Sequence, residues 1–146
     1  MARSTLAAVC LAVVASTLLA SCGGGGGGRR TVFTPGPPTS VIGRWQGRLH
    51  QRGLTPFRVT AAIRSLRHSR ANRVWYTGID CAGYWRYLGR RRRTFRFREV
   101  IARGRGGKCK GVGTVTLTPL TGDRLGYRFQ GGGVLSRGVL LHVYGG

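Results

Sequence analysis

From Val41 onward, apolar and polar residues alternate with a period of two, and this pattern limits the fold more than any other feature of the chain. In residues 57–64 the apolar set is Phe57, Val59, Ala61 and Ile63, and residues 94–98 and 114–118 alternate in the same way. Successive side chains of a strand point to opposite faces, so this period predicts strands. Gly, Asn, Asp and Pro separate the alternating segments, as turns require.

The expected strands number seven or eight, at roughly ten-residue spacing, with no convincing helix. They are residues 44–49, 57–64, 74–77, 84–88, 94–101, 114–118, 125–129 and 139–144. We therefore expect an all-β domain, either a small antiparallel barrel or a sandwich, because both architectures share this strand pattern.

The chain is strongly basic, with 25 Lys and Arg against 3 Asp and Glu and a net charge of +22. Because 41% of the residues are hydrophobic and 19% are charged, the composition is that of a chain that folds. Three carboxylates exclude sites that need several of them, such as a calcium cage or a two-metal centre. Arginine on the outward positions makes the predicted exterior strongly positive, and its self-repulsion opposes folding.

The first 21 residues have the pattern of an export signal. Arg3 precedes an apolar stretch, residues 6–20, interrupted only by Ser16 and Thr17. At about 15 residues the stretch is shorter than the roughly 20 that span a bilayer as a helix, although an uncleaved anchor is the alternative. Residues 19–22, Leu-Ala-Ser-Cys, resemble the bacterial lipobox, which implies cleavage before Cys22 and lipidation of its thiol.

Lipidation at Cys22 would place the protein on the outer face of the membrane, because two or three acyl chains anchor a protein stably. Residues 22–40 form a Gly/Pro-rich tether whose r.m.s. span is on the order of 25 Å for a flexible chain. We expect a lipoprotein signal at 1–21, this tether at 22–40 and a β-domain at 41–146.

Two cysteines remain for the β-domain, because Cys10 leaves with the signal and Cys22 carries the lipid. In an oxidising compartment we expect Cys81 and Cys109 to pair. Such a bridge closes a loop of about 29 residues and stabilises the domain by roughly 3–4 kcal/mol in the chain-entropy model. A metal site is the alternative, but no histidine stands at ligand spacing from the two cysteines.

An ordered set of short motifs in the β-domain resembles a known family. The motifs are residues 43–47, 76–83, 97–101, 113–117 and 125–127, together with Gly104 and Cys109. They resemble the small secreted β-domain that follows the membrane span of some actinobacterial serine/threonine kinases and that also occurs as stand-alone lipoproteins. The resemblance implies an extracytoplasmic β-domain with a Cys81–Cys109 bridge and no catalytic activity. The family's polar Ser/Thr surface is replaced here by arginine.

The opening motif, Gly-Arg-Trp-Gln-Gly at residues 43–47, also resembles the start of lipocalin-like barrels. In those barrels the tryptophan closes one end, a role that the resemblance would give to Trp45.

Groups for enzymatic chemistry are scarce. Glu99 is the only carboxylate inside an expected strand, and we interpret it as an ion-pair partner of Arg96, Arg98 or a cross-strand arginine, or as a partly exposed edge residue. A lone acid in a pocket is the functional alternative. Asp80 and Asp123 are interpreted as structural. No serine lies in a Gly-x-Ser-x-Gly context, and the three histidines lack metal-like spacing. We expect no catalytic residue, metal or cofactor.

A basic cluster is the predicted binding site, placed in two neighbouring turns at one end of the sheet. Its members are Arg90, Arg91, Arg92, Arg93, Arg96, Arg98, Arg103, Arg105, Lys108 and Lys110. Interleaved aromatic residues at 84, 85, 87, 95 and 97 would suggest nucleic acid in a cytoplasmic protein. Outside the membrane the available anions are headgroups, wall-linked phosphate polymers and acidic polysaccharides.

The sequence thus favours a non-enzymatic envelope lipoprotein that binds anionic polymers or lipid headgroups. A secreted nucleic-acid-binding protein and a lipocalin-like carrier of a small apolar ligand are the alternatives. A membrane kinase or transporter is a further candidate partner. The interior separates two of these hypotheses, since a lined cavity favours carriage and a solid core favours surface binding.

Overall fold

A computed structural model describes residues 38–67, 69–104, 108–109 and 111–145. The predicted signal, the lipidation site Cys22 and the tether up to residue 37 lie outside these residues, as do His68 and two members of the basic cluster, Arg105 and Lys110. The elements are β1 (Gly43–Gln51), β2 (Phe57–Ile63), the 3-10 turn η1 (Ser69–Ala71), β3 (Arg73–Thr77), β4 (Cys81–Arg91), β5 (Thr94–Arg103), β6 (Val112–Pro119), β7 (Arg124–Gly131) and β8 (Val134–Val143).

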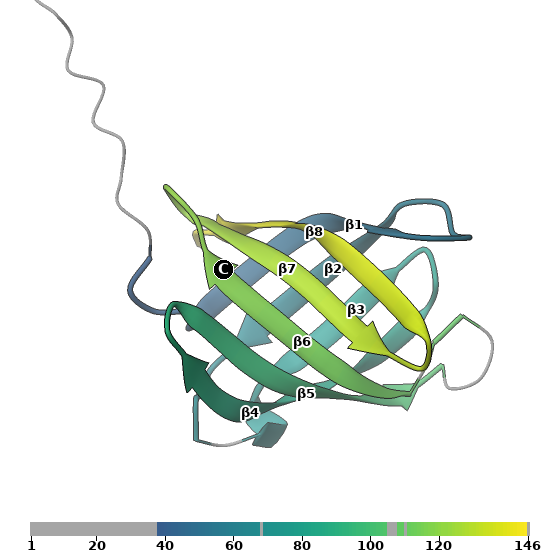
Figure 1. The fold of residues 1–146 in the computed structure, drawn as a ribbon, viewed down its shortest axis with the longest axis horizontal. Helices are drawn as coiled ribbons and strands as arrows, with labels where there is room; N and C mark the ends of the chain where they lie inside the picture. Colours follow the sequence, from purple (N-terminus) through teal and green to yellow (C-terminus); the bar gives the residue numbers. More distant parts are fainter. Residues whose placement is uncertain (1–37, 68, 105–107, 110, 146) are drawn as a thin grey trace, which may run out of the picture. The chain divides into compact units, whose positions relative to one another are not determined.

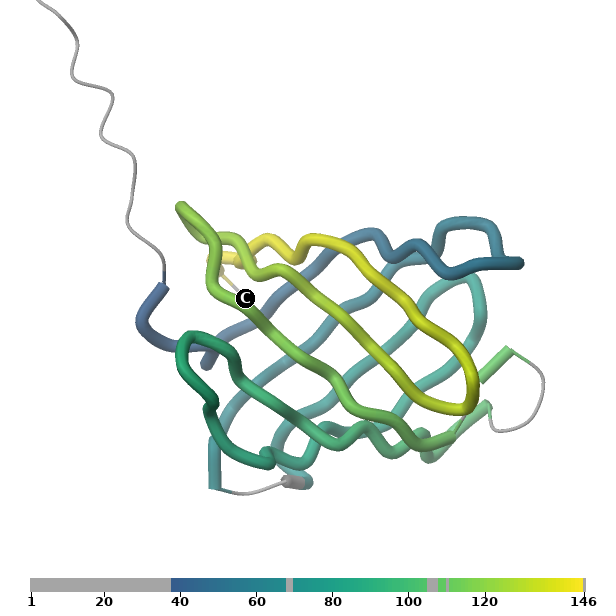
Figure 2. Tube along the Cα trace, in the orientation of Figure 1, coloured from purple at the N-terminus to yellow at the C-terminus, as the bar shows by residue number. Residues whose placement is uncertain are grey.

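The eight strands form a closed antiparallel barrel in which each strand pairs with its neighbours in sequence (Figure 1). The ring closes because β1 pairs with β2 on one side and with β8 on the other. The strands run obliquely around the barrel (Figure 2). This decides between the two predicted architectures in favour of the barrel, which has no free sheet edge. None of the helical segments described is long and apolar enough to cross a membrane.

Successive connections alternate between the two ends of the barrel, as an up-and-down meander requires. We call tether end the end where β1 begins; it carries the β2–β3, β4–β5 and β6–β7 connections and the end of β8. The opposite end carries the other four connections, and we call it the disulfide end. Residue 38, where the described chain starts, lies at the tether end (Figure 1).

The inward positions of the strands fill the barrel with a continuous apolar core. Trp45 and Leu49 of β1 and all four predicted inward residues of β2 are buried, which confirms the period-two prediction. The largest fully buried side chains are Trp45, Trp85 and Phe97. Eight strands enclose a space that side chains of this size can fill.

Two inward glycines let strands approach more closely than a side chain would permit. A Cβ atom on Gly47, inside the predicted opening motif, would lie 2.2 Å from the carbonyl oxygen of Val139 on β8. A Cβ atom on Gly83 would lie 2.1 Å from the carbonyl oxygen of Val100. Gly83 adjoins one of the two irregularities in the β4–β5 register, where the extra residue bends the strand.

The predicted disulfide is confirmed. Cys81, the first residue of β4, is bridged to Cys109 in the β5–β6 connection, with their Cα atoms 6.2 Å apart. This separation lies within the normal range for a disulfide. The bridge ties the start of β4 to the β5–β6 connection at the disulfide end.

Several strands, such as β4, are longer than the sequence predicts, and one polar residue of a connection is buried. Strand β8 begins at Val134 rather than near residue 139, because Gly132 and Gly133 adopt positive φ angles of 55° and 75° and reverse the chain within two residues. Asn72, in the polar connection between β2 and β3, is completely buried. Its Oδ1 accepts bonds from the backbone N–H groups of Arg64 and Ser65, and its Nδ2 donates to the carbonyls of Ser65 and Trp85.

Candidate functional site

The predicted basic cluster does not gather at one end of the barrel, and this part of the prediction was wrong. The β4–β5 turn carries Arg90–Arg93 at the tether end, whereas Arg103 and Lys108 lie at the disulfide end. The reason is that consecutive turns of an antiparallel meander fall at opposite ends of their shared strand. Arg96 and Arg98 are exposed on the outer face of β5 between the two ends. The described members therefore form a stripe along β5.

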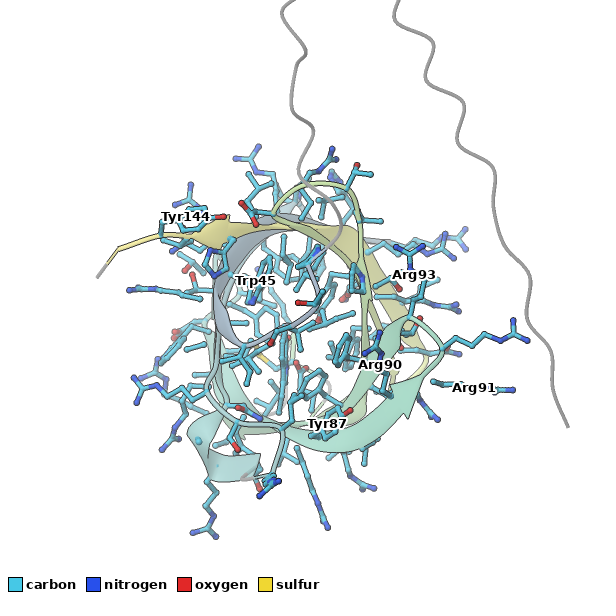
Figure 3. The ribbon with its side chains drawn as sticks, turned by 90° about the vertical axis from the view of Figure 1, so that its left-hand side faces the viewer. Trp45, Tyr87, Arg90, Arg91, Arg93 and Tyr144 are labelled. Carbon is cyan, nitrogen blue, oxygen red and sulfur yellow. A yellow bond between two sulfur atoms is a disulfide. The ribbon has the colours of Figure 1, made fainter. Side chains whose placement is uncertain are left out.

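The β4–β5 turn projects arginine side chains away from the barrel (Figure 3). Arg90 is fixed in place, with its guanidinium carbon 4.9 Å from the centre of the Phe95 ring and its Nε donating to the carbonyl of Arg92 at 2.9 Å. Arg92 lies in a two-residue hairpin turn and has a φ of 54°, which glycine adopts more readily than other residues do. The turn thus keeps an arginine at some conformational cost.

Exposed apolar side chains accompany these arginines at the tether end. Ile42 is 49% exposed, Leu88 is 50% exposed and Tyr144 is 69% exposed. Tyr144 and Arg91 lie on different sides of the end-on view, so basic and apolar groups are spread over the end (Figure 3). Mixed basic and apolar residues of this kind suit a membrane–water interface.

The aromatic residues near the basic stripe do not form a free stacking platform. Trp85, Phe95 and Phe97 are buried in the core. Tyr87 is half-buried, with its ring 5.3 Å from that of Phe97, and Tyr84 is also half-buried. Stacking of unpaired bases needs exposed ring faces, so this surface gives little support to single-stranded nucleic acid as the partner.

Glu99 lies inside the barrel, so our interpretation of it as an ion-pair partner or an exposed edge residue was wrong. The structure agrees better with the alternative, a lone acid beside a pocket. Glu99 is only 4% exposed, and its partners are a phenol and an indole rather than an arginine. Arg96 and Arg98 point outward on β5, whereas residue 99 falls on the inward face with Phe95 and Phe97. The sequence held this signal, since residue 99 has the same parity as those two phenylalanines.

A short hydrogen-bond chain holds the Glu99 carboxyl. Its Oε2 accepts from Tyr76 Oη and, at 2.8 Å, from Trp85 Nε1. Tyr76 Oη lies 3.1 Å from Tyr127 Oη, and because Tyr76 donates its proton to Glu99, Tyr127 donates to Tyr76. The four residues come from β3, β4, β5 and β7, so the chain crosses the interior.

Burial dominates the acid–base properties of this cluster. It raises the pKa of Glu99 above its ordinary value, and the hydrogen bonds from Tyr76 and Trp85 offset part of the rise. Burial also raises the pKa of Tyr76 and of Tyr127 well above the usual value for a phenol, and the nearby Glu99 charge adds to both. The interior therefore favours the neutral form of all three groups.

A small cavity of about 30 Å³ adjoins the cluster toward the disulfide end. Glu99, Tyr76 and Tyr127 line it together with Gln51 and Ser136, whose hydroxyl donates to Gln51 Oε1 at 2.6 Å. This volume accommodates a water molecule, whereas pockets for small organic ligands measure roughly 300–1,000 Å³.

At the tether end, Trp45 lies inside the ring of strands, in the closing position implied by the lipocalin-like resemblance (Figure 3). Its Nε1 donates to the carbonyl of Val41 at 2.9 Å, and its ring meets the ring of His142 edge-on at 4.8 Å. His142 in turn contacts Tyr144 at 4.5 Å between ring centres. These contacts seal the end of the barrel from which the tether leaves.

Comparison of the chain with protein-family models, with curated proteins and with solved structures found no match. Over the described residues, no three His, Cys, Asp or Glu side chains stand close enough together to hold a metal ion. Asp80 and Asp123 lie in turns; Asp80 has a positive φ of 49°, which aspartate tolerates, and the Asp123 carboxylate accepts a hydrogen bond from Tyr144 Oη.

Proposed function

We propose that this chain is a non-enzymatic envelope lipoprotein, anchored through Cys22, whose basic barrel binds anionic polymers or lipid headgroups on the outer face of the membrane. The observation that carries the proposal is the unbalanced exterior charge. The chain has 25 cationic residues against 3 carboxylates, and one of those carboxylates, Glu99, is buried in the core. A surface of this kind attracts polyanions.

The tether end is the part best suited to approach the bilayer. It carries Arg90–Arg93 and several exposed apolar side chains, and the first described residues lead into β1 there. Each basic residue close to an anionic surface contributes about 1 kcal/mol, so these four arginines contribute about 4 kcal/mol in contact. The glycine-favouring φ of 54° at Arg92 also supports a function for that side chain.

The filled interior favours binding at the surface over carriage of a small ligand inside the barrel. A carrier needs an unfilled barrel, and the space beside Glu99 amounts to about 30 Å³. The resemblance to the secreted domain of actinobacterial kinases supports an extracytoplasmic module, and a membrane kinase or transporter is a candidate partner.

The anchor is tested by labelling expressed protein with a palmitate analogue. Wild type should incorporate the label and C22S should not. An unlabelled wild-type protein would overturn the anchor but leave the charge-based binding open to its own test.

Binding is tested by sedimenting the full chain of C22S, which cannot carry the lipid, with vesicles of neutral lipid and with vesicles containing about one-third anionic lipid. Wall polymer rich in phosphate forms a third arm. We expect clearly stronger co-sedimentation with the anionic vesicles than with neutral vesicles, to which the retained apolar leader can bind, or co-sedimentation with the polymer, or both. Equal binding to neutral and anionic vesicles, without binding to the polymer, would contradict the proposal.

A further inference from the structure

Strand β6 presents threonines to solvent between two arginine-bearing strands. Val115 and Leu117 are buried, so Thr114 and Thr116 fall on the outer face, where both are half-buried. Thr116 is paired with Arg96 of β5 on one side and with Arg128 of β7 on the other. The three residues form one row across the sheet. With strands about 4.8 Å apart, the two arginine Cα atoms are about 10 Å apart.

A second row lies beside the first, two residues along β6. Here Thr114 is paired with Arg98 and with Gln130. Arg128 Nη2 donates to Gln130 Oε1 at 3.3 Å, and this hydrogen bond links the two rows. It uses the oxygen of the Gln130 amide and does not involve the amide N–H groups, which are donors. Each row therefore has a guanidinium on β5, a hydroxyl on β6 and a polar donor on β7.

Five of the six residues in these rows, all except Arg98, line a shallow surface groove. Arg96, Thr114, Thr116, Arg128 and Gln130 line a hollow of about 280 Å³ on the outer wall of the barrel. No carboxylate lines it, since Asp80 and Asp123 lie in end turns and Glu99 points into the core. A hollow with two positive charges and hydroxyl donors, and without an anion of its own, suits a ligand that only accepts hydrogen bonds.

We propose that this groove binds the phosphate groups of a linear phosphate-bearing polymer, with Arg96 and Arg128 flanking one phosphate and the Thr116 hydroxyl donating to it. The inference rests on the proposed function and assigns it a site and a ligand class. A polymer is favoured over a bilayer headgroup because Thr116 lies midway along β6, on the side wall, whereas a flat membrane would contact an end of the barrel. The second row offers a place for a neighbouring phosphate, and linked contacts of this kind strengthen each other.

The test uses the full chain in neutral detergent and inorganic polyphosphate as the probe, at constant salt. The double variant R96Q/R128Q removes two charges from the groove. Its matched control, R73Q/R86Q, removes two charges from the neighbouring strands β3 and β4, outside the described hollows. All four side chains are exposed, so both variants should keep the fold, which circular dichroism checks. We expect the groove variant to lose at least tenfold more affinity than the control.

Thr116→Val tests the site without any change of charge. It should weaken polyphosphate binding about tenfold, because a hydrogen bond to a charged group contributes about 1.5 kcal/mol. Thr118→Val, on the same face of β6 but outside the groove, should have little effect. The groove would be overturned, but not the proposed function, if the two double-arginine variants lost the same affinity for polyphosphate and if T116V bound polyphosphate as well as T118V does. A wild-type chain that binds no polyphosphate but binds anionic vesicles would also overturn the groove alone, and binding to neither would overturn both.

Discussion

The buried carboxyl of Glu99 should make the barrel less stable as the pH rises. Burial raises its pKa in the folded state, so the folded chain holds a proton that the unfolded chain releases near pH 4.3. Between the unfolded and the folded pKa, the free energy of unfolding then falls by up to about 1.4 kcal/mol per pH unit. The contribution is fully present below the unfolded pKa and is lost as the pH rises through the folded pKa.

Glu99→Gln removes this titration while keeping an amide oxygen to accept from Tyr76 and Trp85. The unfolding free energy of wild type minus that of E99Q should therefore decrease as the pH rises above about 4.3. For a domain of about 100 residues, 1.4 kcal/mol corresponds to a change of about 7 °C in Tm. The assay is urea unfolding followed by tryptophan fluorescence at half-unit steps from pH 4 to pH 8, with the disulfide intact.

Asp80→Asn is the matched control, since it removes one carboxylate from an exposed turn and Asn tolerates the φ of 49° there. D80N should keep the decline in stability seen in wild type. A wild-type minus E99Q difference that stays constant with pH, or that favours wild type as the pH rises, would refute the reasoning.

Three further changes test the scaffold and its surface. C81S/C109S should lower the unfolding free energy by about 3–4 kcal/mol, because the unfolded chain gains entropy when the link between residues 28 positions apart is removed. Unfolding in guanidinium measures this loss, and a loss below about 1 kcal/mol would contradict the prediction. Asn72→Ala should cost about 3 kcal/mol by leaving buried backbone groups unpaired, again measured in guanidinium, whereas a neutral effect would refute the buried network. Arg92→Gly should raise stability by about 1 kcal/mol and weaken binding to anionic vesicles about fivefold, and unchanged binding would remove this side chain from the proposed surface.

Much of the fold was predictable because the period of two is a local signal. A side chain that must face the core has to stand at every second position, as in Phe57, Val59, Ala61 and Ile63, and the structure confirms that face. Barrel closure was not predictable, because it depends on β8 pairing with β1, a contact between segments about 90 residues apart that leaves no mark in the alternation. The disulfide was predictable because two cysteines remained once the other two had been assigned.

The candidate site was less predictable, for two reasons. The residues of the basic stripe were identifiable one by one, but their arrangement depends on which turns share an end of the barrel. Glu99 was misread because its charge was given more weight than its position. Its parity with Phe95 and Phe97 placed it inside, where Tyr76 and Trp85 of other strands satisfy it.

The central claim, that an unbalanced positive exterior binds polyanions, is tested most directly by the salt dependence of polyphosphate binding to the full chain. If about four phosphates are neutralised, the affinity should fall about 150-fold between 50 and 300 mM salt with the slope of a single-stranded polyanion, because bound counterions are released on association. The logarithm of the affinity should fall steeply and in a straight line with the logarithm of the salt concentration. An affinity that stays the same across this range would contradict it.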